Sequence, residues 1–129
     1  MWIRILAVMA GGAVGSALRY QVGGWAHRLF DGVFPIGTFV VNVAGSFFIG
    51  LLWSLFEEGD LQLNWRLFLF TGLMGGFTTF SSFSLETLNL VRTREYGLAL
   101  ANVAGNNLLG LLAVTGGFLL GRWIVRAAR

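Results

Sequence analysis

The sequence predicts an all-α membrane protein with four transmembrane helices, and its composition and length lead to that class. Hydrophobic residues make up 56% of the 129 residues, charged residues make up 12%, and the mean hydropathy is +0.73. A soluble domain has about 25% charged residues, so this composition is typical of a membrane protein. A spanning helix needs about 20 residues. Four spans therefore occupy most of a single domain, at about residues 2–24, 35–56, 65–91 and 97–123.

The composition also excludes several classes of function. The chain has no cysteine, so neither a disulfide framework nor a thiolate metal site is available. With one histidine, His27, and no paired carboxylates inside the spans, it offers no nucleophile with a base and no metal triad, so we expect no enzyme. All nine basic residues are arginines near span ends, which indicates interface anchoring instead of nucleic-acid binding.

The first span contains small residues at the spacing that lets two membrane helices pack closely. Gly11 and Gly15 are four residues apart, as are Gly12 and Ser16, and we interpret both pairs as ordinary packing positions. Arg19 is predicted near the end of this span. There it either reaches the lipid headgroups or attracts an anion at the mouth of a pore.

The second span has a polar or small residue at every fourth position. A spacing of four keeps such residues near one face of a helix, which then borders water or a neighbouring helix. The face consists of Thr38, Asn42, Ser46, Gly50 and Ser54. Asn42 is compatible with two interpretations, a hydrogen bond between helices or a position along an ion path.

The third span is interrupted by residues 75–84, Gly-Gly-Phe-Thr-Thr-Phe-Ser-Ser-Phe-Ser. Gly75 and Gly76 loosen the backbone, and the hydroxyl side chains after them replace backbone hydrogen bonds. Non-helical backbone is tolerated at membrane depth only where protein buries it or where it lines a watery cavity. The sequence therefore predicts a helix break at Gly75–Gly76 that builds a binding site.

The side chains around the predicted break suit a small ion. Phe77, Phe80 and Phe83 are spaced by three and form one ridge if the helix resumes after the glycines. The positive edges of aromatic rings favour an anion and their faces favour a cation, while core packing is the alternative interpretation. Backbone carbonyls freed near Gly75 and Thr78 are predicted to hold a monovalent cation.

The fourth span adds amide donors. Asn102 and Asn106 lie on one helix face, and we include Asn106 among the predicted pore residues. Glu86 is the only acid within a span, and we expect it near the span's end or in a watery vestibule.

The arginines are almost evenly divided between the two sides of the predicted membrane. Five belong to the side with both termini and four to the other. The side with the termini has Arg4, Arg66, Arg122, Arg126 and Arg129, and the other side has Arg19, Arg28, Arg92 and Arg94. Because an excess of Lys and Arg sets orientation, this chain lacks a strong signal and is predicted to insert both ways round. Two oppositely inserted copies can pair about an axis in the membrane plane.

The chain resembles the Fluc (CrcB) fluoride channels of microorganisms across all four spans. The matching stretches are Gly-Gly-Phe-Thr-Thr-Phe-Ser-Ser-Phe-Ser-Leu-Glu at 75–86, Gly-Thr-Phe-Val-Val-Asn at 37–42, and Gly-x-x-x-Gly-Ser-Ala-Leu-Arg at 11–19. The resemblance implies an antiparallel, dual-topology homodimer in the inner cell membrane. That dimer would enclose two pores, export fluoride passively from the cytoplasm, and hold a structural sodium ion at its broken third helices.

The resemblance also implies roles for individual residues. Phe80 and Phe83 resemble the pore phenylalanines, and Asn42 resembles the pore asparagine. Ser81 and Thr79 fit the polar path. Gly75 and Thr78 fit the sodium site through their backbone carbonyls. The fourth span departs from the hydroxyl-rich track of some members, with Asn102, Asn106 and Gly110 in its place.

Two other functions fit a small four-span protein less well. A dual-topology drug/proton exporter needs an intramembrane carboxylate, typically in the first span, and this first span has no Asp or Glu. A purely structural membrane subunit would have no use for a polar helix break that is expensive in lipid.

Overall fold

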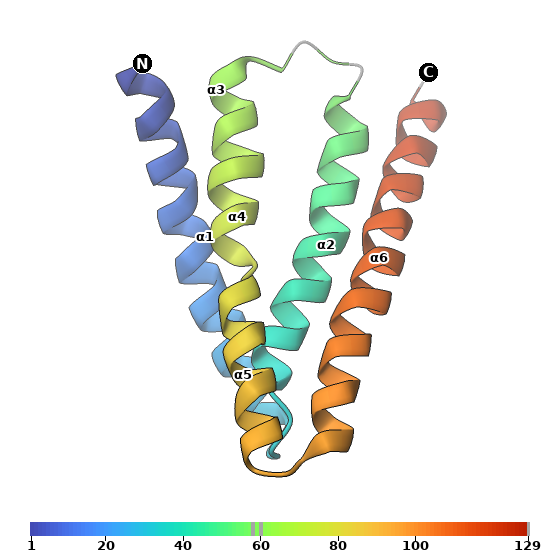
Figure 1. Ribbon diagram of the computed structural model, residues 1–129. Helices are drawn as coiled ribbons and strands as arrows, with labels where there is room; N and C mark the ends of the chain where they lie inside the picture. Colours follow the sequence, from blue (N-terminus) through green and yellow to red (C-terminus); the bar gives the residue numbers. More distant parts are fainter. Residues whose placement is uncertain (58, 60, 129) are drawn as a thin grey trace.

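A computed structural model describes residues 1–57, 59 and 61–128 of the chain. Every regular element among these residues is helical, which confirms the all-α class (Figure 1). Four helical segments are long and apolar enough to cross a membrane. They are Trp2–Leu29, Ile36–Phe56, Leu63–Arg92 and Tyr96–Ala127.

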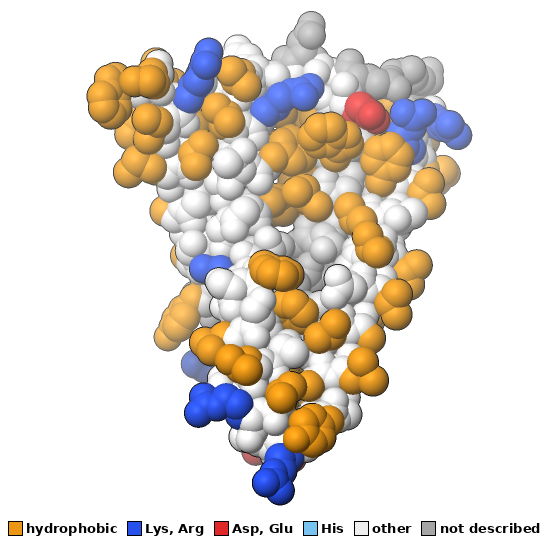
Figure 2. Space-filling model, in the orientation of Figure 1, with side chains coloured by type: hydrophobic (Ala, Val, Ile, Leu, Met, Phe, Trp, Pro, Cys, Tyr) orange, Lys and Arg blue, Asp and Glu red, His pale blue; other side chains and the backbone are white. Residues whose placement is uncertain are grey.

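The segments run up and down, so neighbours in sequence are antiparallel (Figure 1). Three of them are α1 (Trp2–Leu29), α2 (Ile36–Phe56) and α6 (Tyr96–Ala127). The third segment consists of α3 (Leu63–Arg66), the π-helix η1 (Leu67–Met74), α4 (Gly75–Phe77) and α5 (Phe80–Arg92). Both termini lie at the end where the segments spread apart, and the α5–α6 connection lies at the other end. Hydrophobic side chains cover much of the visible face, with basic side chains mainly at its two ends (Figure 2).

Glycines bring α1 close to the first half of the third segment. Gly11 and Gly15 of α1 are buried against backbone atoms of η1 and α4, so this predicted pair does face another helix, whereas a Cβ added to Gly12 would meet no atom within 4 Å. From the other side, a Cβ added to Gly72 would lie only 2.7 Å from the carbonyl oxygen of Val8. Gly76 contributes in the same way, four residues after Gly72. Small residues on both helices thus permit backbone-to-backbone contact.

A second glycine-lined contact joins α2 to α6. Gly50 faces the carbonyl group of Val114, and a Cβ added to Gly121 would lie 2.9 Å from the carbonyl oxygen of Leu51. Gly117 is also buried in this contact. The described part of the chain therefore contains two tight helix pairs, α1 with η1 and α4, and α2 with α6.

The structure corrects the predicted end of the first helix. The first span was predicted to end at about residue 24, but α1 continues to Leu29. His27 and Arg28 occupy its last turn, where positive charge interacts favourably with the helix dipole. Arg19 therefore lies ten residues before the end of α1.

The third segment is broken, as predicted, but the break is at Thr78–Thr79 and not at Gly75–Gly76. Both glycines are helical and neither has a positive φ angle, while the missing side chain of Gly76 permits close contact with α1. Thr78 and Thr79 are extended, with ψ angles of 160° and 112°. Thr79 then caps α5, since its hydroxyl oxygen accepts from the N–H of Ser82 at 3.2 Å.

Candidate functional site

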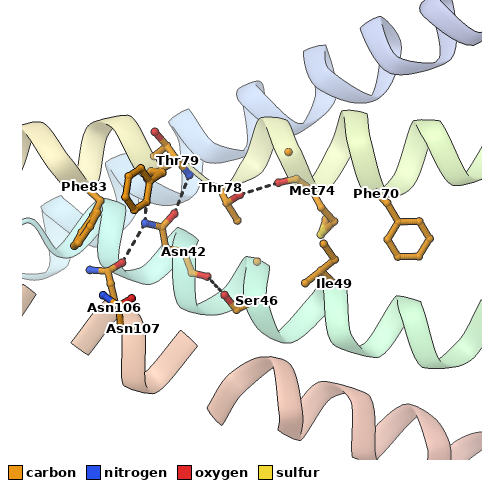
Figure 3. Close-up of a pocket in the computed structure, with 13 residues that line it drawn as sticks. Asn42, Ser46, Ile49, Phe70, Met74, Thr78, Thr79, Phe83, Asn106 and Asn107 are labelled. Atoms are coloured by element: carbon orange, nitrogen blue, oxygen red, sulfur yellow. Dashed lines mark hydrogen bonds between the residues drawn. The ribbon is translucent and has the colours of Figure 1, made fainter. Parts of the chain in front are cut away.

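Asn42 of α2 satisfies the backbone of the broken helix. Its Oδ1 accepts from the N–H of Thr79 at 2.8 Å, and its Nδ2 donates to the carbonyl oxygen of Thr79 at 3.2 Å. One side chain therefore pairs both backbone polar groups of Thr79, which belong to the two successive peptide units on either side of it (Figure 3). Such pairing is what allows extended backbone at membrane depth.

The same geometry changes what the carbonyl groups at the break can bind. In a continuous α-helix the carbonyl of Gly75 would accept from the N–H of Thr79, but that N–H donates to Asn42. The Gly75 carbonyl thus loses its helical donor. The carbonyl oxygen of Thr78 accepts from Nη1 of Arg19 at 3.3 Å. The predicted cation ligands therefore lie at the break, with a guanidinium group beside one of them.

A row of hydrogen bonds leads from Asn42 through α6 to α5. Asn42 Nδ2 also donates to Oδ1 of Asn106 at 3.1 Å, and Asn106 Nδ2 donates to Oδ1 of Asn102 at 2.9 Å. Asn102 Nδ2 then donates to the hydroxyl of Thr87 at 2.9 Å. Thr87 in turn donates to the carbonyl oxygen of Phe83 at 2.8 Å. We call these five residues the amide relay.

A cavity of about 390 Å³ lies beside the break, between α2, the third segment and α6. It is lined by Asn42, Gly45, Ser46, Ile49, Phe70, Met74, Gly75, Thr78, Thr79, Phe80, Phe83, Asn106 and Asn107. Figure 3 shows the amides of Asn42 and Asn106 near one end of this cavity and the ring of Phe70 at the other. We call it the break cavity. No acidic side chain is among its described lining residues, and its polar groups are amides, hydroxyls and backbone.

Two of the three predicted phenylalanines form a pair in the break cavity. The ring centroids of Phe80 and Phe83 are 5.5 Å apart, with 48° between the ring planes. Phe83 is buried, whereas Phe80 is 79% exposed. Phe77 does not continue this ridge, because it lies before the break in α4 and is buried against Gly45 of α2. The predicted three-ring ridge is therefore wrong, since the break changes the direction of the chain between Phe77 and Phe80.

A second cavity of about 310 Å³ reaches the break from the side of α1. It is lined by Arg19, Tyr20, Gly23, Gly24, His27, Gly37, Thr38, Val41, Thr79 and Ser82. Thr79 lines both cavities, so they meet the broken helix at the same residue. Arg19 lines this second cavity at the level of the break, where it donates to the carbonyl oxygen of Thr78. A half-buried cation there can attract an anion from one cavity toward the amides of the other.

Two other predicted polar residues lie near these cavities without lining either. Ser81 is exposed, and its hydroxyl oxygen lies 3.4 Å from that of Thr79. Glu86 Oε1 accepts from the hydroxyl of Thr38 at 2.6 Å. Its Oε2 is buried without a hydrogen-bond partner among the described residues. Thr38 thus begins the polar face of α2 that continues with Asn42 and Ser46.

Sequence reasoning missed the links between these residues. The spacing of Asn102 and Asn106 indicated a shared face, and in the structure that face points at Asn42 and Thr87. Nothing in the sequence distinguished Thr87 from the other hydroxyl residues of the third segment. Its partner is known only once α5 lies against α6.

Comparison with known proteins identifies clear relatives. A family model described as "CrcB-like protein, Camphor Resistance (CrcB)" matches residues 6–118. A protein of Parabacteroides distasonis named "Fluoride-specific ion channel FluC" is 52% identical over 123 residues, covering 95% of this chain and 96% of the relative. Proteins with the same name from Maridesulfovibrio salexigens and Thermus thermophilus are 45% and 48% identical, each over 95% of this chain. These matches extend over 98% and 96% of the two relatives' own lengths.

Proposed function

The chain belongs to the CrcB-like family, and from this premise we propose that it is a fluoride-specific ion channel that conducts its ion passively. Its relatives are named as ion channels, which is a non-enzymatic function. The single observation that supports this function best is the break at Thr78–Thr79. There, Asn42 and the Phe80–Phe83 pair meet in a cavity whose described lining contains no acid.

The groups around the break suit a small, strongly hydrated anion. Fluoride gives up its water only where donors replace it. The amides of Asn42 and Asn106 and the hydroxyls of Ser46 and Thr79 line the break cavity, and each would exchange a hydrogen bond within the protein for one to the ion. The edges of aromatic rings add a weak attraction. Conduction requires binding strong enough to admit an ion and weak enough to release it, which neutral donors provide. Arg19, on the other side of Thr79, would collect anions before they reach these donors.

We propose that two copies of the chain assemble as an antiparallel, dual-topology homodimer in the inner cell membrane. Phe80 supports this assembly, because its ring is 79% exposed at the edge of a partly polar cavity, where a second copy would cover it. The arginines support opposite orientations. Among the described residues, four lie near the end with both termini and three near the other end, with Arg19 at the break. Arg129 is outside the described residues.

A structural sodium ion at the centre of that dimer is part of the proposal. The Gly75 carbonyl has lost its helical donor, and Gly75 is exposed. The Thr78 carbonyl lies one turn further along the chain and is shared with Arg19. Two carbonyls form only part of a coordination shell, and a second copy would bring the same two. Unwound membrane helices hold Na⁺ through such carbonyls.

The proposed function is tested by ion efflux from liposomes that contain the purified full-length protein. We expect fluoride to leave rapidly and chloride to be retained. F80I and F83I keep a bulky apolar side chain but remove the polarised ring edge, so fluoride efflux should fall sharply in both. F48I is the matched control, because Phe48 is 46% exposed on α2 and lines neither cavity. If both cavity variants conduct at the parent rate, the two rings serve only packing and the assignment of the pore is wrong.

A further inference from the structure

We propose that Asn102 and Thr87 are positioning residues that hold α5 so that the Phe80–Phe83 pair faces Asn42. This inference rests on the proposed function, because it concerns the same ion path. Asn102 is fully buried, with 0% of its surface exposed, yet it lines neither the break cavity nor the cavity of Arg19. Its contribution to conduction would therefore pass through the residues that it contacts.

Each side chain of the relay donates to the next residue, so its hydrogen bonds run in one direction from Asn42 to Phe83. Asn42 Oδ1 accepts from the Thr79 backbone, so its amide nitrogen is left to donate to Asn106. Asn106 accepts with its oxygen and donates onward to Asn102, which donates to Thr87. Each amide has its orientation set by its neighbours. Loss of one member therefore leaves buried polar groups unpaired on both sides of the gap.

The break explains why α5 needs a second attachment. Helical continuity ends at Phe77, so the angle between α4 and α5 is not fixed by backbone hydrogen bonds across Thr78–Thr79. The bonds between Asn42 and Thr79 hold the start of α5. Thr87 lies eight residues later, about 12 Å along the helix axis. The bond from Asn102 to Thr87 attaches this part of α5 to α6, while the bond between Glu86 and Thr38 attaches it to α2. Together with the bonds of Thr79 they determine the direction of the helix and thus the position of both rings, and loss of the bond to α6 would let α5 tilt away from that helix.

Thr87 connects the side chains of the relay to the backbone of Phe83, which carries one of the two rings. Its hydroxyl accepts from Asn102 on α6 and donates to the carbonyl oxygen of Phe83. A valine at this position has the same shape and loses both hydrogen bonds, whereas a serine retains the hydroxyl. The pair T87V and T87S therefore separates the hydrogen bond from the shape of the side chain.

The chain also offers a control for the general effect of losing a threonine hydroxyl. Thr93, at the end of α5, donates to the carbonyl oxygens of Asn89 and Leu90 in its own segment, both at 3.1 Å. T93V removes a hydroxyl of the same kind outside the relay. It should leave fluoride efflux and selectivity at the parent level.

The experiment compares parent, T87V, T87S and T93V proteins in liposomes, with flux expressed per folded protein. We expect T87V to lower fluoride efflux about fivefold, the factor equivalent to about 1 kcal/mol for the lost hydrogen bond between α5 and α6. We also expect a higher chloride-to-fluoride flux ratio, because loosely held rings fit the anion less closely. T87S should restore both quantities. A loss of stability alone would lower the amount of folded protein without changing the flux ratio.

Hydrogen exchange measures the attachment of α5 independently of conduction. The amides of residues 83–92 should exchange faster in T87V than in parent, T87S or T93V protein. Equal exchange and equal flux ratios in T87V and T87S would overturn the positioning role. A parent protein that carries no fluoride would instead overturn the proposed function, and the two failures are distinct because the first requires a conducting parent.

Discussion

At the scale of single residues, Asn42 determines how the helix break is tolerated. Its amide forms hydrogen bonds with the N–H and the carbonyl group of Thr79 and also reaches Asn106. A leucine has similar volume and forms none of these bonds. An unpaired buried polar group costs about 1–3 kcal/mol. N42L should therefore lower the free energy of unfolding by roughly 2–4 kcal/mol and abolish fluoride efflux.

The measurements for this prediction are thermal unfolding in detergent and liposome efflux. N107L is the matched control, because Asn107 lines the same cavity but is exposed and bonds the Val103 carbonyl of its own helix. It should unfold close to the parent temperature. Equal stability of N42L and N107L would show that Asn42 does not support the break. N42D should fold better than N42L yet block fluoride, since a carboxylate accepts from the Thr79 N–H but repels an anion.

At the scale of helices, the contact between α1 and the first half of the third segment depends on missing side chains. A Cβ on Gly15 would overlap the carbonyl group of Leu73 and lie 2.9 Å from the backbone nitrogen of Phe77. Backbone atoms cannot move aside as a flexible side chain can. Overpacking of this kind costs about 1–3 kcal/mol, so G15A should lower the unfolding temperature and the yield of folded protein.

Gly12 provides the control on the same helix, since a Cβ there would meet no atom within 4 Å. Alanine is better than glycine in a helix by about 1 kcal/mol. G12A should therefore unfold at the parent temperature or above it. The prediction fails if G12A and G15A are equally stable in the same detergent, because the effect would then not arise from contact between the helices.

At the scale of the whole molecule, the nearly even distribution of arginines should produce two orientations in the membrane. Attaching a reporter to the C-terminus and assaying its side in cells should detect both populations. Changing the distribution of arginines tests whether it sets the orientation. R94Q together with R92Q removes two positive charges from the end opposite the termini. The remaining arginines then favour a cytoplasmic location for the termini.

The expected consequence of that change is a loss of active protein. A single orientation yields no antiparallel pairs, so fluoride efflux should fall in the double variant even though both residues lie outside the two cavities. Co-expression with a variant whose arginines favour the opposite orientation should restore fluoride efflux. A parent protein with one orientation in nearly all molecules would contradict the proposed dimer.

Several features of the site were predictable because they depend on short stretches of sequence. The run of hydroxyls and phenylalanines after Gly75 indicated an interrupted span, and the third segment is interrupted. Asn42 stood out as a polar residue in an apolar span, and it does contact the break. The glycine spacing in the first span indicated close helix packing, and Gly11 and Gly15 do face backbone atoms.

The position of the break was not predictable from the same stretch. Glycine favours flexibility in isolation, but Gly76 is helical because α1 packs directly on it. The break falls where Asn42 can replace the backbone partners of Thr79 and where Thr79 can cap the next helix. Which peptide unit leaves a helix depends on the partner available to it, and here that partner is 37 residues away in sequence.

By itself the sequence determined that this protein is an all-α membrane protein with four spans, an interrupted third span and neutral donors inside it. Composition and local spacing determine these properties, because lipid admits apolar helices and penalises unpaired backbone. Only the tertiary structure decided that Arg19 reaches the break, that Phe77 is separated from Phe80, and that Asn102 connects to Thr87. Each of these depends on which helix faces surround the break, and glycines distributed over α1, α2 and α6 bring those faces together.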